Sequence, residues 1–117
     1  MMRLHGLTMT SLEIPFRQAF THASATRAKT EAVLVHAESA RGLVGMGEGC
    51  PRHYVTGETV TGAQEFFRSH RAEWMTCASM DDLQAWGTEH VDLIDRNPAA
   101  WCAVETACLD LLGKELG

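Results

Sequence analysis

The first fifty residues alternate between apolar and polar side chains with the two-residue period of β-strands. Leu7 and Met9 alternate with polar neighbours on one parity, and Leu12 and Ile14 do so on the other parity. A change of parity within one strand is typical of a β-bulge, which inserts one extra residue. The pattern therefore predicts a first strand with a bulge near residues 10–11.

Two further strands are predicted over residues 31–38 and 43–49, joined by a turn that ends at Gly42, where a positive φ is available. The second strand places three aliphatic side chains on one face: Val33, Val35 and Ala37. These two strands form a hairpin, and the first strand joins them as an antiparallel meander. The connection over residues 15–30 is too long and too polar for a tight turn, and loops of that size in a compact domain are often functional.

From residue 56 onward the apolar spacing changes to that of α-helices. The first helix is predicted to begin at Thr56 as N-cap, with Glu58 in the first turn, where the helix dipole favours an acid. Its apolar face carries Val60, Ala63, Phe67 and His70. The second helix opens at Ser79, which with the acidic residues after it is close to a capping box. Its apolar stripe consists of Leu83, Trp86, His90 and Leu93.

The third helix has the clearest start, with Asn97 as N-cap and Pro98 at the first helical position, and it is expected to end at Gly113. Within it only Glu105 and Asp110 are charged. Its apolar surface therefore extends nearly all the way round. A helix of this kind is buried on most sides.

Three antiparallel meander strands followed by three helices predict an α+β fold, in a single domain over residues 1–117. A sheet of three strands can cover only one side of the third helix. The apolar surface left over, which includes Trp101, is larger than monomeric proteins usually expose. A second copy could cover it through a two-fold interface, which predicts a homodimer or larger homo-oligomer built on the helix at residues 98–112. The alternative is that the helix buries both sides within one chain, which would leave the chain monomeric.

Composition narrows the class of protein. Hydrophobic residues make up 45% of the chain and charged residues 21%, which is typical of a soluble globular protein. A net charge of -5 with no run of basic residues argues against a nucleic-acid partner. The sequence shows neither a signal peptide nor a stretch of about eighteen apolar residues that could span a membrane. Its four cysteines form no C-x-x-C pair, so we expect reduced thiols and a cytoplasmic location.

The residues offer no persuasive catalytic or metal site. Among six histidines, only His53 has a cysteine close by, Cys50, and one such pair without a second half is weak support for zinc. Gly45, Gly47 and Gly49 do not match the phosphate-binding pattern G-x-G-x-x-G. Glycine at every second strand position is more typical of close backbone approach. No nucleophile elbow G-x-S-x-G is present, and we predict no catalytic and no metal-binding residue in this chain.

Two segments combine aromatic, basic and small residues: FRQAFTHASATR at residues 16–27 and CPRHYV at residues 50–55. Either one alone could be an ordinary solvated connection. A meander, however, brings the connection after its first strand and the exit from its third strand to the same end of the sheet. Together the two segments could form a lid over one site.

Five stretches of sequence, IPF, FTHASATR, EAVLVHAE, GLVGMGEGCPRHYVTGET and NPAAWCAVETACLDLLGK, occur in that order along nearly the whole chain. Together they resemble the N-terminal capping domain of the enolase superfamily, in its mandelate-racemase and muconate-lactonizing branch. The likeness is greatest to the dipeptide epimerases of that branch. Its most specific pieces are G-x-G-E-x-x-P-R-x-Y-V-T-G-E-T at residues 45–59 and A-V-E-x-A-x-x-D-L-x-G-K at residues 103–114.

The resemblance implies a cap that closes the mouth of a modified TIM barrel, with two loops over the substrate that set specificity. By position, these loops match residues 15–30 and 49–55. The candidate substrate-loop residues within them are Phe20, His22, Ser24, Arg27, Cys50, Arg52, Tyr54 and Val55. Either Arg27 or Arg52 is expected to face the substrate, because a guanidinium can hold a carboxylate through two hydrogen bonds.

Catalysis in this family belongs to the barrel, whose strands carry lysine bases and acidic ligands for a magnesium ion, and the helix from Asn97 would pack between cap and barrel. A TIM barrel needs about 200 residues or more, and the chain stops at Gly117, where the first barrel strand would begin. We therefore expect a substrate-specificity cap of an isomerase that is inactive alone and holds no cofactor. Its barrel is missing or separately encoded, and Mg²⁺ and a dipeptide or other carboxylate substrate are implied only for the complete enzyme. The alternative is a stand-alone α+β module that works through binding or dimerisation.

Overall fold

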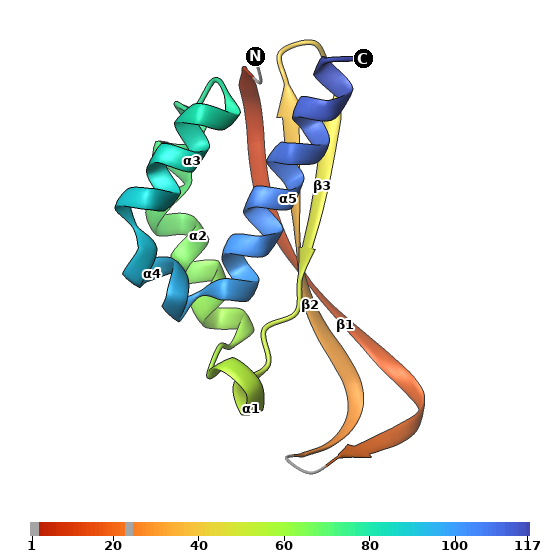
Figure 1. The fold of residues 1–117 in the computed structure, drawn as a ribbon. Helices are drawn as coiled ribbons and strands as arrows, with labels where there is room; N and C mark the ends of the chain where they lie inside the picture. Colours follow the sequence, from red (N-terminus) through yellow and green to blue (C-terminus); the bar gives the residue numbers. More distant parts are fainter. Residues whose placement is uncertain (1–2, 23–24) are drawn as a thin grey trace.

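The computed structural model describes residues 3–22 and 25–117, and it describes the side chains of these residues except at positions 16, 18–22 and 25–29. Three strands come first and helices follow, which confirms the predicted α+β class (Figure 1). The elements are β1 (Leu4–His22), β2 (Ala25–Ser39), β3 (Val44–Gly49), α1 (His53–Thr56), α2 (Val60–Met75), α3 (Met80–Glu89), α4 (Val91–Arg96) and α5 (Pro98–Glu115).

The strands form an antiparallel sheet in the order β1-β2-β3, as the meander prediction requires. The bulge predicted near residues 10–11 is wrong, because pairing is regular there and the register shifts lie between Leu4 and Gly6 and between Pro15 and Phe20. The apolar residues Leu12 and Ile14 lie on the other parity without a bulge. They lie where no helix covers the sheet, and both are exposed.

The predicted loop over residues 15–30 is for the most part strand. β1 continues to His22 and β2 starts again at Ala25, whereas the pairing of β3 with β2 ends at Val33. On the side of Val33 toward Ala25, β1 and β2 therefore continue without β3, as a two-stranded ribbon (Figure 1). Antiparallel pairing satisfies backbone hydrogen bonds without a hydrophobic core, so the polar composition of this segment is compatible with strand structure.

Helix α5 lies directly against the glycines of β3. Gly45, Gly47 and Gly49 alternate along the strand and face the helix, which runs antiparallel to β3. A Cβ atom at these positions would lie 2.0 to 2.2 Å from carbonyl oxygens of α5, those of Ala107, Ala103 and Ala99. Real Cβ atoms do not approach so closely, so the prediction that these glycines mark close backbone approach is confirmed.

The other side of α5 is covered by α2, α3 and α4 of the same chain (Figure 1). Trp101 is only 8% exposed and Val104 is fully buried. The prediction that α5 is buried on most sides is confirmed. Within one chain α2, α3 and α4 already cover Trp101 and Val104, as the alternative interpretation expects, while Leu109 is left exposed on the outer face. The predicted homodimer or larger homo-oligomer stays a prediction.

The rings between α2, α3 and α5 form one aromatic cluster. Trp86 and Trp101 stack with their ring centroids 5.0 Å apart, and Trp74 meets Trp86 edge to face at 5.3 Å. Phe66 and His70 pack on the same group. Aromatic pairs in these arrangements stabilise a core beyond their buried area, and here they join the helices that cover α5.

Hydrogen bonds from α5 also cover the outer edge of β3. The backbone N–H of Met46 donates to Asp110 at 2.9 Å, and the Lys114 ammonium donates to the Val44 carbonyl at 2.6 Å. Asp110 and Lys114 lie 3.3 Å apart, one helical turn from each other. On the other edge of the sheet, Arg71 of α2 donates to the carbonyl of Leu7. Covered edges of this kind discourage pairing with strands of other chains.

One predicted helix start needs correction. The N-cap of α2 is Thr59, whose hydroxyl accepts from the N–H of Gly62, and not Thr56. Thr56 instead ends the short helix α1, which the sequence did not predict. Ser79 caps α3 as predicted, by accepting from the N–H of Asp82.

The second predicted helix is interrupted at His90, so α3 and α4 are separate helices. Helix α5 begins at Pro98 as predicted, but the Asn97 side chain donates to the Leu93 carbonyl and does not cap the helix. The helix also continues past Gly113 to Glu115. In the part of the chain that the structure describes, no helix is long and apolar enough to cross a membrane.

Candidate functional site

The candidate site is built on the segment that follows β3. Arg52 and Tyr54 are half-buried, whereas Val55 is exposed. Residues His53–Thr56 form the single turn of α1, which ends at Gly57 in the left-handed conformation that glycine adopts without strain. Between this segment and the start of α5 lies an open depression of about 430 Å³, lined by Glu48, Gly49, Cys50, Arg52, Val55, Thr56, Glu58, Pro98, Ala99 and Cys102.

Arg52 ties this segment to the base of the ribbon. Its guanidinium donates to the backbone carbonyl of Cys50 at 3.2 Å and to the hydroxyl of Thr30 on β2 at 3.5 Å. The pKa of Arg52 is raised, first by a hydrogen bond with the Cys50 side chain and further by Tyr54, while partial burial opposes the shift. The side chain is therefore a permanent cation in the wall of the depression.

Glu58 connects the same segment to α5. Its side chain is buried, and its carboxylate accepts from the backbone N–H of Ala99 at 3.0 and 3.1 Å and from that of Ala100 at 3.3 Å. It also accepts from the Thr56 hydroxyl at 2.7 Å. The first N–H groups of a helix have no partner within it and attract negative charge, so Glu58 supplies the cap that Asn97 does not.

Sequence reasoning missed this role of Glu58 and placed the residue in the first turn of α2. It lies 41 residues before Ala99, so no local spacing pattern could have paired the two. The only indirect signal is that α5 opens with a proline and lacks an acidic residue in its first turn. Such a helix leaves N–H groups for a partner from elsewhere in the chain.

The candidate residues of the second segment come together around the depression. The Cys50 thiol points to the Glu48 carboxylate, with Sγ and Oε1 3.5 Å apart. Cys50, Arg52 and Val55 line the depression, and Tyr54 contacts Arg52. The structure therefore groups the four candidates of residues 50–55 with Glu58, which was not among them.

Three candidates of the first segment, Phe20, His22 and Arg27, lie near the far end of the ribbon. Phe20 pairs with Arg27 and His22 with Ala25 across the two strands. The side chains of Phe20, His22 and Arg27, and the whole of Ser24, lie outside the described residues. At the level of the backbone, this end of the ribbon and α1 lie at the same end of the molecule, opposite the turn between β2 and β3 (Figure 1).

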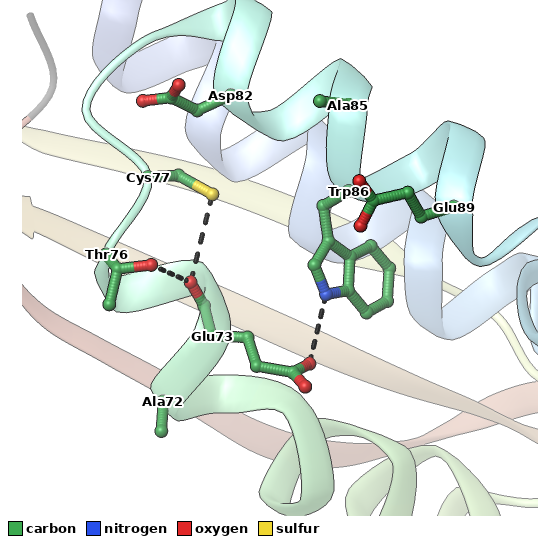
Figure 2. A pocket seen from close by; sticks show the side chains of 8 residues that line it. All are labelled: Ala72, Glu73, Thr76, Cys77, Asp82, Ala85, Trp86 and Glu89. Atoms are coloured by element: carbon green, nitrogen blue, oxygen red, sulfur yellow. Dashed lines mark hydrogen bonds between the residues drawn. The ribbon is translucent and has the colours of Figure 1, made fainter.

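A second hollow lies between α2 and α3. Its volume is about 620 Å³, and it is lined by Ala72, Glu73, Thr76, Cys77, Asp82, Ala85, Trp86 and Glu89 (Figure 2). The Cys77 thiol donates to the backbone carbonyl of Glu73, which also accepts from the Thr76 hydroxyl. Burial raises the pKa of the Cys77 thiol, and since the thiolate is the reactive form, Cys77 is a poor nucleophile.

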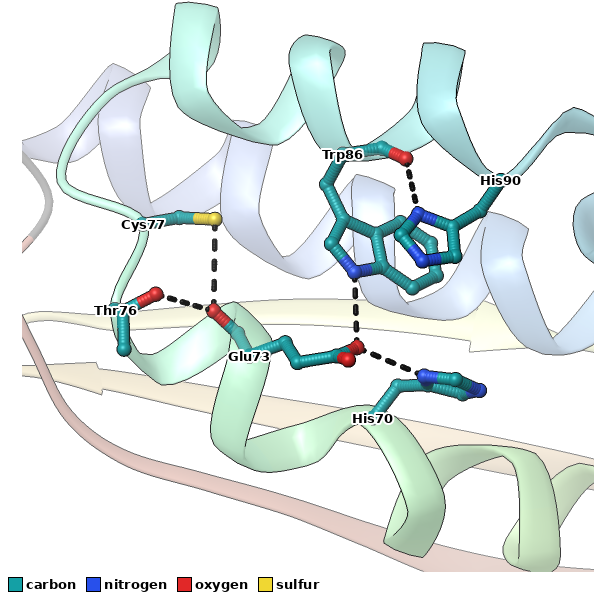
Figure 3. Close-up of polar contacts among 6 residues, drawn as sticks. All are labelled: His70, Glu73, Thr76, Cys77, Trp86 and His90. Atoms are coloured by element: carbon teal, nitrogen blue, oxygen red, sulfur yellow. Dashed lines mark hydrogen bonds and ion pairs between the residues drawn. The ribbon is translucent and has the colours of Figure 1, made fainter.

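The Glu73 carboxylate holds the rim of this hollow together (Figure 3). It lies 2.8 Å from Nδ1 of His70 and accepts from the Trp86 indole N–H at 3.0 Å. These hydrogen bonds, that with His70 first, lower the pKa of Glu73. His90 stacks on Trp86 at 4.1 Å and contacts its backbone carbonyl. The contacts fasten α2 to α3.

Among the described residues, no group of three or more His, Cys, Asp or Glu side chains could hold a metal ion. The described residues therefore do not fit a magnesium site. What the described residues do show is a cationic side chain beside an open depression, at the end of the molecule where the ribbon also lies.

Comparison with known proteins identifies the family of this chain. Residues 6–117 match the family described as "Mandelate racemase / muconate lactonizing enzyme, N-terminal domain". The chain is 29% identical to the hydrophobic dipeptide epimerase of Enterococcus faecalis, over 97% of this chain and 32% of that protein. It is 32% identical to the aromatic dipeptide epimerase of Herpetosiphon aurantiacus, over 95% of this chain and 31% of the relative.

The solved structures agree. The crystal structure of the dipeptide epimerase from Enterococcus faecalis V583, complexed with Mg and the dipeptide L-Leu-L-Tyr, superposes with a TM-score of 0.76 at 26% identity. The match covers 97% of this chain and 32% of that one. The chain thus spans about a third of the length of the relatives it matches. It belongs to the family of mandelate racemase / muconate lactonizing enzyme N-terminal domains.

Proposed function

We propose that this chain is the substrate-specificity cap of an enolase-superfamily isomerase that acts on a dipeptide or a related carboxylate. The catalytic bases and the Mg²⁺ ligands of such an enzyme lie in a barrel domain outside these 117 residues. The chain alone is then inactive. The observation that carries the proposal is the depression beside α1, where a half-buried arginine faces an open surface at the end of the molecule that the ribbon shares.

Arg52 is the residue that we assign to substrate binding. Guanidinium groups carry several N–H donors in a planar fork that matches a carboxylate. Two hydrogen bonds, to the Cys50 carbonyl and the Thr30 hydroxyl, orient the group from one side. A dipeptide carries a terminal carboxylate of the kind that such a fork recognises. Relatives of this chain are dipeptide epimerases, which supports the choice of substrate class.

The experiment replaces the corresponding N-terminal domain of the Enterococcus faecalis epimerase with residues 1–117 and measures kcat/KM for a panel of dipeptides with Mg²⁺. We expect the hybrid to turn over dipeptides with a changed preference. In the hybrid, Arg52→Ala should lower kcat/KM by tenfold or more, mainly through KM. Arg68→Ala, at an exposed position on α2, is the matched control. Unchanged kcat/KM in the Arg52→Ala hybrid would remove Arg52 from the proposal.

The activity of the isolated chain tests the remainder of the proposal. We expect no turnover of any dipeptide by the purified 117-residue chain, with or without Mg²⁺. Measurable epimerisation above that of a control preparation without the chain would contradict the assignment of catalysis to a separate barrel.

The alternative function, a stand-alone binding or dimerisation module, has one observation in its favour. The hydrophobic core closes within this chain, with Trp101 and Val104 covered by its own helices. A domain of this kind can fold without a barrel. A hybrid that folds but shows no turnover with any dipeptide, together with a dimer of the isolated chain in solution, would favour this alternative.

A further inference from the structure

Helix α1 has little buried surface to keep it in place. It consists of four residues, and none of them is buried. So short a helix is not stable by itself in water, because helix formation requires a costly nucleus. Besides the half-buried Tyr54, the structure shows polar contacts at both ends of the helix that hold it in position.

At the N-terminal end, Arg52 bonds to Cys50 and Thr30. At the C-terminal end, the Thr56 hydroxyl donates to the Glu58 carboxylate at 2.7 Å. The same hydroxyl oxygen lies 3.4 Å from the backbone N–H of Glu58. Since Glu58 is itself fixed by the first N–H groups of α5, the Thr56 hydroxyl links α1 to the rigid core of the domain.

We propose that Glu58 and Thr56 are positioning residues for the candidate substrate-binding segment at residues 50–55. The buried Glu58 carboxylate binds the N-terminus of α5 and, through the Thr56 hydroxyl, holds α1 and hence Arg52 at the depression. This inference rests on the proposed cap function for its consequence in catalysis. Its structural content, the coupling of α1 to α5 through one carboxylate, stands on the hydrogen bonds alone.

The two residues separate two roles that a single substitution would mix. Glu58→Gln keeps the shape of the side chain but replaces one acceptor oxygen by an N–H₂ group, which opposes the N–H donors of α5. It therefore disturbs both the cap of α5 and the tie to α1. Thr56→Val removes the hydroxyl and leaves Glu58 on α5, so it disturbs the tie to α1 and the 3.4 Å contact of that hydroxyl with the Arg52 carbonyl, but not the cap of α5. Thr61→Val, at an exposed position in the first turn of α2, is the control of matched chemistry.

Amide hydrogen exchange of the 117-residue chain is the first measurement. The amides of Val55, Thr56 and Gly57 close the turn of α1 by donating to the carbonyls of Arg52 and His53. In Thr56→Val we expect these amides to exchange at least tenfold faster, while those of Ala99 and Ala100 stay as protected as in the unmodified chain. In Glu58→Gln both groups should exchange faster, and in Thr61→Val neither.

One outcome would overturn the proposal: fast exchange at α5 in Glu58→Gln with unchanged exchange at α1 in both variants. Glu58 would then be a helix cap and nothing more. If Glu58→Gln does not fold, as judged by loss of the near-UV circular dichroism of the tryptophans, Thr56→Val still decides the question. These measurements need neither substrate nor barrel, so they hold even if the proposed cap function fails.

Kinetics of the hybrid enzyme is the second measurement. A positioning role predicts that Thr56→Val raises KM for dipeptides by about fivefold or more with little change in kcat, and Thr56→Ser should restore KM because it restores the hydroxyl. A purely structural loss would lower the amount of folded enzyme, and hence the apparent kcat, with KM unchanged. That second result would refute the link between α1 and substrate binding.

Discussion

Replacing Gly47 by alanine tests the contact between α5 and β3 at its closest point. The new Cβ would lie 2.0 Å from the Ala103 carbonyl oxygen, whereas ordinary van der Waals contact begins at 3.4 Å. The helix or the strand must therefore move by about 1.4 Å, the difference of those two distances. The nearest atoms belong to the backbone of Ala103 and Ala107, so no flexible side chain can give way instead.

A shift of this size is costly across the whole interface. A gap of about 0.5 to 1 Å already forfeits a quarter to a half of the dispersion energy of the atoms it separates. Overpacking a core typically costs about 1 to 3 kcal/mol, and more when backbone must move. Fewer conformations of the unfolded alanine chain return only about 0.4 to 1 kcal/mol. We expect Gly47→Ala to lower the free energy of unfolding by about 3 kcal/mol, and the melting temperature by roughly 10 °C.

Urea unfolding followed by tryptophan fluorescence and by circular dichroism measures this change. Gly113→Ala is the control, since it lies in the same helix with no atom within 4 Å of the added Cβ. Alanine is a better helix former than glycine, so the control should be about 0.5 to 1 kcal/mol more stable than the unmodified chain. A Gly47→Ala chain within about 0.5 kcal/mol of the unmodified one would refute the close packing of α5 on β3.

Three further outcomes are expected. Glu73 and Asp110 accept hydrogen bonds in the folded chain, and their pKa values are lowered. The free energy of unfolding should therefore stay constant above the usual carboxyl range and fall as the pH drops below about 4. A urea midpoint that is flat from pH 6 to pH 3 would contradict this. Asp110→Ala uncovers the Met46 N–H on the edge of β3, so sedimentation should show more self-association than in a variant altered at the exposed Glu65, and equal association would argue against edge protection. The unmodified chain should sediment as a monomer at micromolar concentration with Trp101 shielded from quenchers, because its own helices cover α5. A stable dimer would instead support the two-fold interface predicted from the sequence.

Features set by neighbouring residues could be predicted from the sequence. The alternation of Val33, Val35 and Ala37 places β2 on the core, and all three are fully buried. Ser79 and Pro98 mark true helix starts, because a cap and a missing N–H act within one turn. The resemblance to capping domains of the enolase superfamily, stated on residues 45–59 and 103–114, agrees with the family match.

Features set by contacts between distant residues could not. Thr56 and Thr59 have the same N-cap chemistry three residues apart, and the choice of Thr59 follows from Glu58, which turns inward to α5. The ribbon was predicted as a loop because a strand without a core has no apolar alternation to reveal it. Of the candidate site, the segment at residues 50–55 was found from composition, while its attachment through Glu58 depends on a contact 41 residues away.

The glycine contact between β3 and α5 depends on a near match between the repeat of the strand and the repeat of the helix. Two residues of a strand advance about 6.6 Å and four residues of a helix advance about 6.0 Å, so Gly45, Gly47 and Gly49 meet successive turns of α5 with a mismatch of only about 0.6 Å per step. The approach is closest at the middle glycine and nearly as close on either side. A third step, to a fourth glycine, would add to the mismatch, so further glycines would not lengthen the contact. Sliding the helix to the next matching position would take a jump of about 6 Å, a whole turn and more, with nothing in between. The glycines therefore fix the register between β3 and α5.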